Sequence, residues 1–157
     1  MGFFRSTKGS IISDAFKLVE THANLRANIM YDVALYNNHL TIKVPLSKNE
    51  TTLKYSQIID VVYTAELETI SVSKSPIGRA VAGGLLFGGV GAIVGAVSGT
   101  GTKAKKERHF YFIISYTSST GEDKFIHFED TRLYKGAKVA NKLKELCSIS
   151  TPDHAEL

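Results

Sequence analysis

The chain has 157 residues, of which 43% are hydrophobic and 10% aromatic, and this composition is typical of one folded domain rather than a disordered chain. Its single cysteine excludes an internal disulfide, and no Cys/His spacing resembles a zinc site. The net charge of +4 directs attention to anionic partners. The first residues lack an apolar run with a cleavage site, so we expect no secretory signal and a cytoplasmic protein.

Residues 1–27 are expected to form a short arm followed by one amphipathic helix. From Ser10 to about Leu25, apolar residues recur at spacings that fit a single helical face lying on the domain. The members of this face are Ile11, Ile12, Ala15, Phe16, Leu18, Val19 and Ala23.

Residues 28–74 are expected to form short antiparallel strands. Apolar and polar residues alternate in two runs on either side of Asn37-Asn38, a pair typical of a tight turn. Residues 51–56 and 58–66 continue the pattern as one or two further strands. Five apolar side chains of this later part share one parity and are expected to face one side: Leu53, Tyr55, Ile59, Val61 and Tyr63.

Residues 75–103 form an apolar, glycine-rich insert, which we call the insert. Between Ala80 and Val97, eighteen consecutive residues carry no charge and no hydrogen-bonding side chain, and six of them are glycine. Small residues recur at every fourth position, which on a helix gives flat ridges that allow close packing in lipid. In water, each glycine would cost a helix about 1 kcal/mol relative to alanine. We expect membrane contact or self-association through Gly83, Gly84, Leu85, Leu86, Phe87, Gly88, Gly91, Ile93, Gly95 and Gly99.

The basic residues are concentrated around this insert. Six basic residues and one acid lie from residue 74 to 108, whereas the rest of the chain holds thirteen basic and fourteen acidic residues. Such clustering beside an apolar segment favours anionic lipid headgroups over nucleic acid as the partner. These six residues, the basic collar, are Lys74, Arg79, Lys103, Lys105, Lys106 and Arg108.

The remaining sequence predicts a hairpin and a helix. Residues 110–116 form a strong alternating strand, and the turn at 118–123 leads into a second strand at 124–128. Asp130 is expected to be the N-cap of a helix that ends near Cys147, with residues 149–157 as a flexible tail. One apolar stripe of this helix comprises Leu133, Ala137, Ala140, Leu143 and Cys147.

The order of these elements predicts an α+β fold, a bent antiparallel sheet or partly open barrel closed by a C-terminal helix. Four segments carry a resemblance to a known family, namely Leu40–Val44, Leu53–Val61, His109–Phe128 and Asp130–Cys147. Over residues 28–148 the chain resembles the bacterial pleckstrin-homology-like (PH-like) domains, and the resemblance implies binding of lipid, peptide or protein without chemistry. The insert is similar to glycine-zipper segments of bacterial and phage proteins.

The insert has the length of a membrane span but not the topology of one. Eighteen helical residues extend about 27 Å, just short of a hydrocarbon core of about 30 Å. If the strands before and after the insert belong to one sheet, both ends of the insert lie on the same side of the membrane. Three arrangements remain: a helical hairpin bending near 88–91 that enters one leaflet, packing against other copies, or an apolar cover folded onto its own domain.

Motifs for catalysis or metal binding are weak. The segment 89–95 superficially resembles a dinucleotide fingerprint, but its third glycine comes one residue too late. His109 and His127 could approach across the hairpin, yet no Cys or carboxylate cluster accompanies them. Glu129 and Asp130 are explained by helix capping rather than acid–base work. We therefore expect no enzyme, no metal and no cofactor.

The sequence as a whole predicts a non-enzymatic module bound peripherally to the inner face of the membrane. The alternative is an oligomer driven by the glycine zipper. Such an oligomer would perturb membranes, or would capture a small ligand or protein partner between its subunits. Nucleic acid is not expected as a partner.

Overall fold

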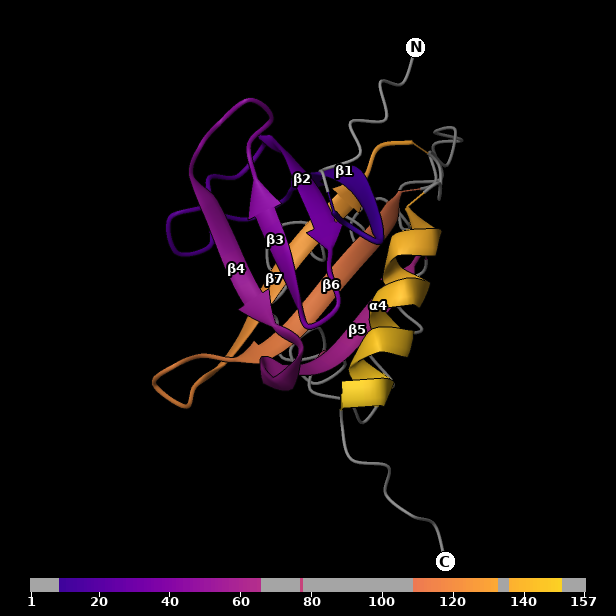
Figure 1. Cartoon of the computed structure of the whole chain (residues 1–157). Helices are drawn as coiled ribbons and strands as arrows, with labels where there is room; N and C mark the ends of the chain where they lie inside the picture. Colours follow the sequence, from indigo (N-terminus) through magenta and orange to yellow (C-terminus); the bar gives the residue numbers. More distant parts are fainter. Residues whose placement is uncertain (1–8, 66–76, 78–108, 133–135, 151–157) are drawn as a thin grey trace, which may run out of the picture.

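The computed structural model describes residues 9–65, 77, 109–132 and 136–150. These residues form one antiparallel seven-stranded sheet in the order β4-β3-β2-β1-β7-β6-β5, with β4 and β5 at its edges (Figure 1). The predicted antiparallel sheet is thus confirmed. The strands are β1 (Ile12–Leu18), β2 (Met30–Leu35), β3 (His39–Lys43), β4 (Glu50–Lys54), β5 (Ile58–Thr64), β6 (Phe110–Thr117) and β7 (Asp123–Asp130), with the 3-10 turn η1 (Tyr55–Gln57) between β4 and β5.

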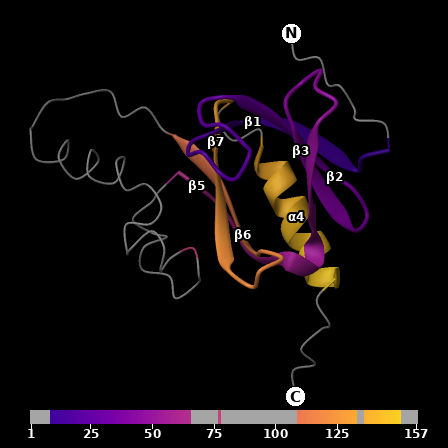
Figure 2. The same cartoon turned by 90° about the vertical axis from the view of Figure 1, so that its left-hand side faces the viewer.

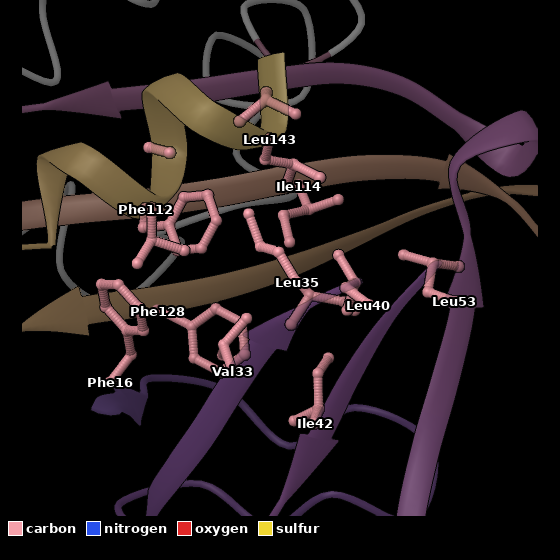
Figure 3. Packing of buried hydrophobic residues seen from close by; sticks show 14 of the residues in the cluster. Phe16, Val33, Leu35, Leu40, Ile42, Leu53, Phe112, Ile114, Phe128 and Leu143 are labelled. Carbon is pink, nitrogen blue, oxygen red and sulfur yellow. The ribbon is translucent and has the colours of Figure 1, made fainter. Parts of the chain in front are cut away.

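The β2–β3 hairpin shows how alternation in the sequence builds the core. Its register runs from Asp32↔Lys43 to Leu35↔Leu40, which confirms the turn expected at Asn37-Asn38. Because side chains on a strand alternate between faces, one set of apolar residues points inward. Figure 3 shows this set converging on β6 and β7, and each member is fully buried: Val33, Leu35, Leu40 and Ile42.

The amphipathic helix predicted between Ser10 and Leu25 is wrong, because residues 12–18 form strand β1. β1 pairs with β2 along its length and with β7 near its end, through Lys17↔Glu129 and Leu18↔Phe128. It therefore joins the two halves of the sheet and satisfies backbone groups on both neighbours. A short apolar run fits helical and strand periods almost equally well, and here strand pairing decides the outcome.

A bulge in β5 changes which side chains face the core. The pairing of β5 with β6 shifts between Ile58 and Asp60. As a result Ile58 and Val61 are buried, whereas Ile59 is 44% exposed. The expectation that Ile59 shares the inward face of Val61 is wrong, because a bulge adds one residue to a strand and shifts the alternation beyond it.

The C-terminal helix is present but begins later than expected, as α4 (Ala137–Ser150). Asp130 is the last residue of β7 and not the N-cap of this helix. The predicted apolar stripe is confirmed at Ala140 and Leu143, which are buried within the same hydrophobic cluster as the strands, and at Cys147, which packs against it. Val139, which was not expected in the stripe, is buried there too. Figure 2 shows α4 on the concave side of the bent sheet. We call this concave side the inner face.

Candidate functional site

Strands β5 and β6 position the insert, because they are the described elements on either side of it. They pair antiparallel, with Thr64 opposite Tyr111, so the chain leaves the sheet and returns to it at neighbouring positions. This confirms the premise that the strands before and after the insert belong to one sheet. The ten residues expected to contact membrane or other copies and the six residues of the basic collar lie outside the described residues, as does the predicted helical hairpin.

Aromatic rings surround this pair of strand ends. Tyr63 on β5 stacks on Phe110 on β6, with ring centroids 6.0 Å apart. The Tyr111 ring contacts both His109 and His127, at centroid distances of 6.3 and 5.2 Å. The two histidines therefore lie on either side of a tyrosine. Nowhere in the described part of the chain do three or more His, Cys, Asp or Glu residues form a metal-binding group.

The convex side of β5, β6 and β7, which we call the outer face, is also buried. Along β6, Phe112 and Ile114 point into the inner cluster, so their neighbours Tyr111, Ile113 and Ser115 point the opposite way. Those three side chains are nevertheless only 8%, 0% and 0% exposed. A strand that is closed to solvent on both faces is typical of the middle of a layered structure rather than its surface.

His127 lies at the centre of the outer face, opposite Ile113 in the register. It is 2% exposed, and burial lowers the pKa of its imidazole to about 3, so the ring is neutral at physiological pH. Ile77, which belongs to the insert, is 0% exposed and is not a member of the inner cluster. The outer face therefore contains a buried neutral histidine among apolar neighbours.

A buried carboxylate joins the base of the insert to helix α4. Asp130 is 3% exposed and accepts hydrogen bonds from Tyr63 Oη at 2.7 Å, from the Gly136 amide at 2.7 Å and from the Arg132 amide at 3.0 Å. Burial, reinforced by the carboxylate, raises the pKa of the Tyr63 hydroxyl. Any side chain at Gly136 would collide with the Phe16 ring and with Asp130. Asp130 was expected to cap the helix. Its carboxylate instead accepts hydrogen bonds from three donors.

A small cleft lined by both polar and apolar side chains lies near the other end of β6, away from the insert. Its volume is about 270 Å³, slightly below the range typical of sites for drug-sized ligands. The His22 ring nitrogen Nε2 lies 2.6 Å from Tyr116 Oη, and burial together with the charge of Lys124 lowers the pKa of His22. The polar side chains of its lining include His22, Thr51, Thr52, Gln57, Tyr116 and Lys124.

Two further observations bear on membrane contact and catalysis. Within residues 9–65, 77, 109–132 and 136–150, no helix is both long and apolar enough to cross a membrane. Cys147 packs against the inner cluster, and burial raises the pKa of its thiol to about 11. The thiol is therefore protonated at neutral pH and lacks the thiolate that a nucleophilic cysteine requires.

The outer face was not predicted, although the sequence carries a signal for it. Residues 110–114, Phe-Tyr-Phe-Ile-Ile, are all apolar or aromatic, and an uninterrupted run of this kind is typical of a strand that is buried on both sides. The alternation of Phe112 and Ile114 accounts only for the side chains that point into the inner cluster. The Asp130 network had no comparable signal, because it depends on the register of β5, β7 and the start of α4.

Comparison with known families agrees with this architecture. A family model described as a glycine zipper containing PH domain matches residues 17–128, which include strands β2 to β6 in full, the end of β1, most of β7 and the whole insert. No match was found among curated proteins.

Proposed function

Because this chain belongs to the family of glycine zipper containing PH domains, we propose that it is a non-enzymatic binding module that attaches peripherally to the cytosolic face of the membrane. The observation that carries this proposal is the antiparallel pairing of Thr64 with Tyr111, because the strands that precede and follow the insert are then neighbours in one sheet. The chain leaves the sheet and returns to it at neighbouring positions, so the apolar segment is attached at a single place.

The insert and the basic collar supply two separate contributions to membrane binding. The eighteen uncharged residues from Ala80 to Val97 offer apolar contact with the acyl boundary. Each collar residue adds roughly 1 kcal/mol of attraction near an anionic surface. Neither contribution requires the chain to cross the bilayer, and a single crossing would separate β5 from β6.

Self-association through the glycine zipper is the second candidate function. The small residues at every fourth position favour close contact between helices, either within a membrane or between copies of the chain. An assembly of this kind would perturb a bilayer, or would hold a small ligand or a protein partner between subunits. The cleft at His22 and Tyr116 supports ligand binding at the end of β6 remote from the insert.

Co-sedimentation with vesicles tests the membrane proposal. The parent chain is mixed with phosphatidylcholine vesicles that contain or lack about one third phosphatidylglycerol, and leakage of a trapped dye is followed in the same samples. We expect binding to the anionic vesicles without leakage, whereas leakage would favour the membrane-perturbing oligomer. Binding should weaken as salt rises from about 0.05 to 0.5 M, because the screening length falls to a few ångströms.

Two triple variants of equal charge test whether vesicle binding depends on the basic collar or only on the net charge of the protein. The collar variant replaces Lys103, Lys105 and Lys106 by Gln, and the control replaces three exposed lysines elsewhere by Gln. We expect the collar variant to lose at least tenfold in binding to anionic vesicles and the control to bind like the parent. Equal loss in both variants would remove the collar from the mechanism. The control lysines are Lys54, Lys138 and Lys144.

A further inference from the structure

Two isoleucines are fully buried without belonging to the inner cluster. Ile113 lies on the outer face of β6, and Ile77 lies in the insert, and both are 0% exposed. Helix α4 does not account for their burial, because its buried residues belong to the inner cluster on the opposite side of the sheet. Each of these side chains therefore needs a partner surface other than the inner core.

We infer that these two buried surfaces cover one another: the Ile77 side chain packs on the outer face of β6 and β7, over Ile113 and His127. The outer face is thus an intramolecular binding surface for Ile77. In the protein free of lipid, this contact holds Ile77 against the domain.

The length and attachment of the chain support this occupant. The residues between Thr64 and Ile77 number about a dozen, enough to span roughly 40 Å when extended. The segment begins at the end of β5, beside Tyr111, and so starts at the border of the face that it is inferred to cover. A second copy of the chain would have to reach the same surface past this tethered segment.

The chemistry of the outer face fits a contact that can be broken. Its centre is apolar at Ile113 but also contains the neutral ring of His127 and the hydroxyl of Ser115. The Ser115 Oγ is buried and has no hydrogen-bond partner among the described residues. Polar groups buried with incomplete hydrogen bonding make an interface weaker than an apolar core of equal area.

The outer face and the membrane would compete for Ile77. This part of the inference rests on the proposed function. Apolar surface of the insert that enters the headgroup region cannot remain against the protein. If lipid draws Ile77 away, Tyr111, Ile113 and His127 become accessible. Exposure of the outer face would then accompany membrane binding.

Modification of His127 by diethyl pyrocarbonate, read by mass spectrometry, tests the inference in the full chain. The parent should react slowly at His127, while Ile77→Lys should react at least tenfold faster because the lysine cannot remain in an apolar contact. Ile59→Lys is the matched control, since Ile59 is 44% exposed on β5, and its His127 should react like that of the parent. Equal rates in Ile77→Lys and the parent would overturn the inference.

A measurement on the parent protein tests the inference even if the Ile77→Lys variant fails to fold. We expect nuclear Overhauser contacts between the Ile77 methyl groups and the side chains of Ile113 or Tyr111, and their absence would overturn the inference. In a third arm, anionic vesicles of phosphatidylcholine and phosphatidylglycerol are added. Faster His127 modification in sedimented protein supports the competition with lipid, and an unchanged rate contradicts it. Failure to sediment contradicts the membrane proposal alone, because the contacts in solution do not depend on lipid.

Discussion

The two faces of strand β6 are both closed to solvent, but they are closed differently. On the inner face, Phe112 and Ile114 pack into a continuous cluster with β1 to β5, β7 and α4. On the outer face, Ile113 is equally buried, yet its neighbours include Ser115 and the neutral ring of His127. The inner face holds the fold together, whereas the outer face combines burial with polar groups that an ordinary core excludes.

Within strand β6, the inner face therefore serves stability, whereas the outer face is free to serve function. Aromatic contacts on the inner face are close, with Phe16 and Phe112 ring centroids 5.0 Å apart and Phe112 and Phe128 5.9 Å apart. Such packing resists rearrangement, because protein interiors are as dense as organic crystals. The outer face lies beside the strand ends that carry the insert, so a change in its cover leaves the inner cluster intact.

The largest expected effect compares adjacent isoleucines on opposite faces. Ile114→Ala should cost about 2–5 kcal/mol of unfolding free energy, because it leaves a cavity in a rigid core. Ile113→Ala should cost at least about 1 kcal/mol less, since a separately attached cover can settle into the space. Urea titration of both variants measures the difference. A greater loss for Ile113→Ala would mean that the outer face belongs to the structural core.

Replacing Ile77–Thr102 by a short Gly/Ser linker sharpens the same comparison. The linker joins two neighbouring strand ends, so the sheet and α4 should still unfold in one cooperative transition. In this background Ile113→Ala should lose most of its cost, whereas the cost of Ile114→Ala should be unchanged. An unfolded linker variant would show that the insert is part of the core.

The next effect concerns pH and is expected from His127 on the outer face. Burial lowers the pKa of His127 to about 3 from 6.5, so between these values the unfolded chain binds more protons than the folded chain. The stability contributed by neutral His127 is therefore complete above pH 6.5 and is lost as pH falls toward 3. Between pH 6.5 and 4.5 this amounts to roughly 2–3 kcal/mol, at about 1.4 kcal/mol per pKa unit.

His127→Phe isolates that contribution, because the variant retains the ring but cannot bind a proton. Its unfolding free energy, measured by urea titration at several pH values, should fall less steeply than that of the parent below pH 6.5. His39→Phe, at a partly exposed position on β3, is the control and should follow the parent. Parallel curves for parent and His127→Phe would show that His127 is accessible to protons in the folded protein.

The hydrogen-bond network at Asp130 should show a smaller effect. Asp130→Asn places an amide group where the carboxylate accepts from Tyr63 and Gly136, so at least one buried bond is lost at about 1–3 kcal/mol. Tyr63→Phe removes one donor alone and should cost about 1 kcal/mol. Thermal unfolding measures both. A loss for Asp130→Asn no greater than that for Tyr63→Phe would contradict the three-donor arrangement.

Patterns within short stretches of sequence predicted most of the strands. Features that depend on contacts between distant parts of the chain were not predicted. The β2–β3 hairpin was predictable because its alternation and its turn lie within fourteen consecutive residues. Strand β1 was mistaken for a helix because the apolar residues between 11 and 23 also fit one helical face. Phe16 and Leu18, two residues apart, instead share the inward face of a strand. β1 pairs with β2 along its length, and its last residues also pair with β7, more than a hundred residues away.

The outer face illustrates a second limit of sequence reasoning. The apolar run from Phe110 to Ile114 indicates that both sides of β6 are buried, but it does not name what buries each side. Composition identified the insert, and the pairing of β5 with β6 fixed where it is attached. The bulge at Ile59 had no local signal, because it arises from the fit between two strands.

The smallest effect on folding is expected within the insert, where the question is contact between helices. Gly84→Leu combined with Gly88→Leu fills one ridge of small residues, whereas Val81→Leu combined with Val94→Leu adds apolar volume away from that ridge. Both variants should keep the unfolding free energy of the parent within about 0.5 kcal/mol, because neither changes a residue of the sheet or of α4. Both should also still bind anionic vesicles. Only the glycine variant should self-associate less in light scattering, since bulky side chains keep helices apart. If both associate like the parent, the glycine spacing has no packing role, and apolar contact of the insert alone remains to explain membrane binding.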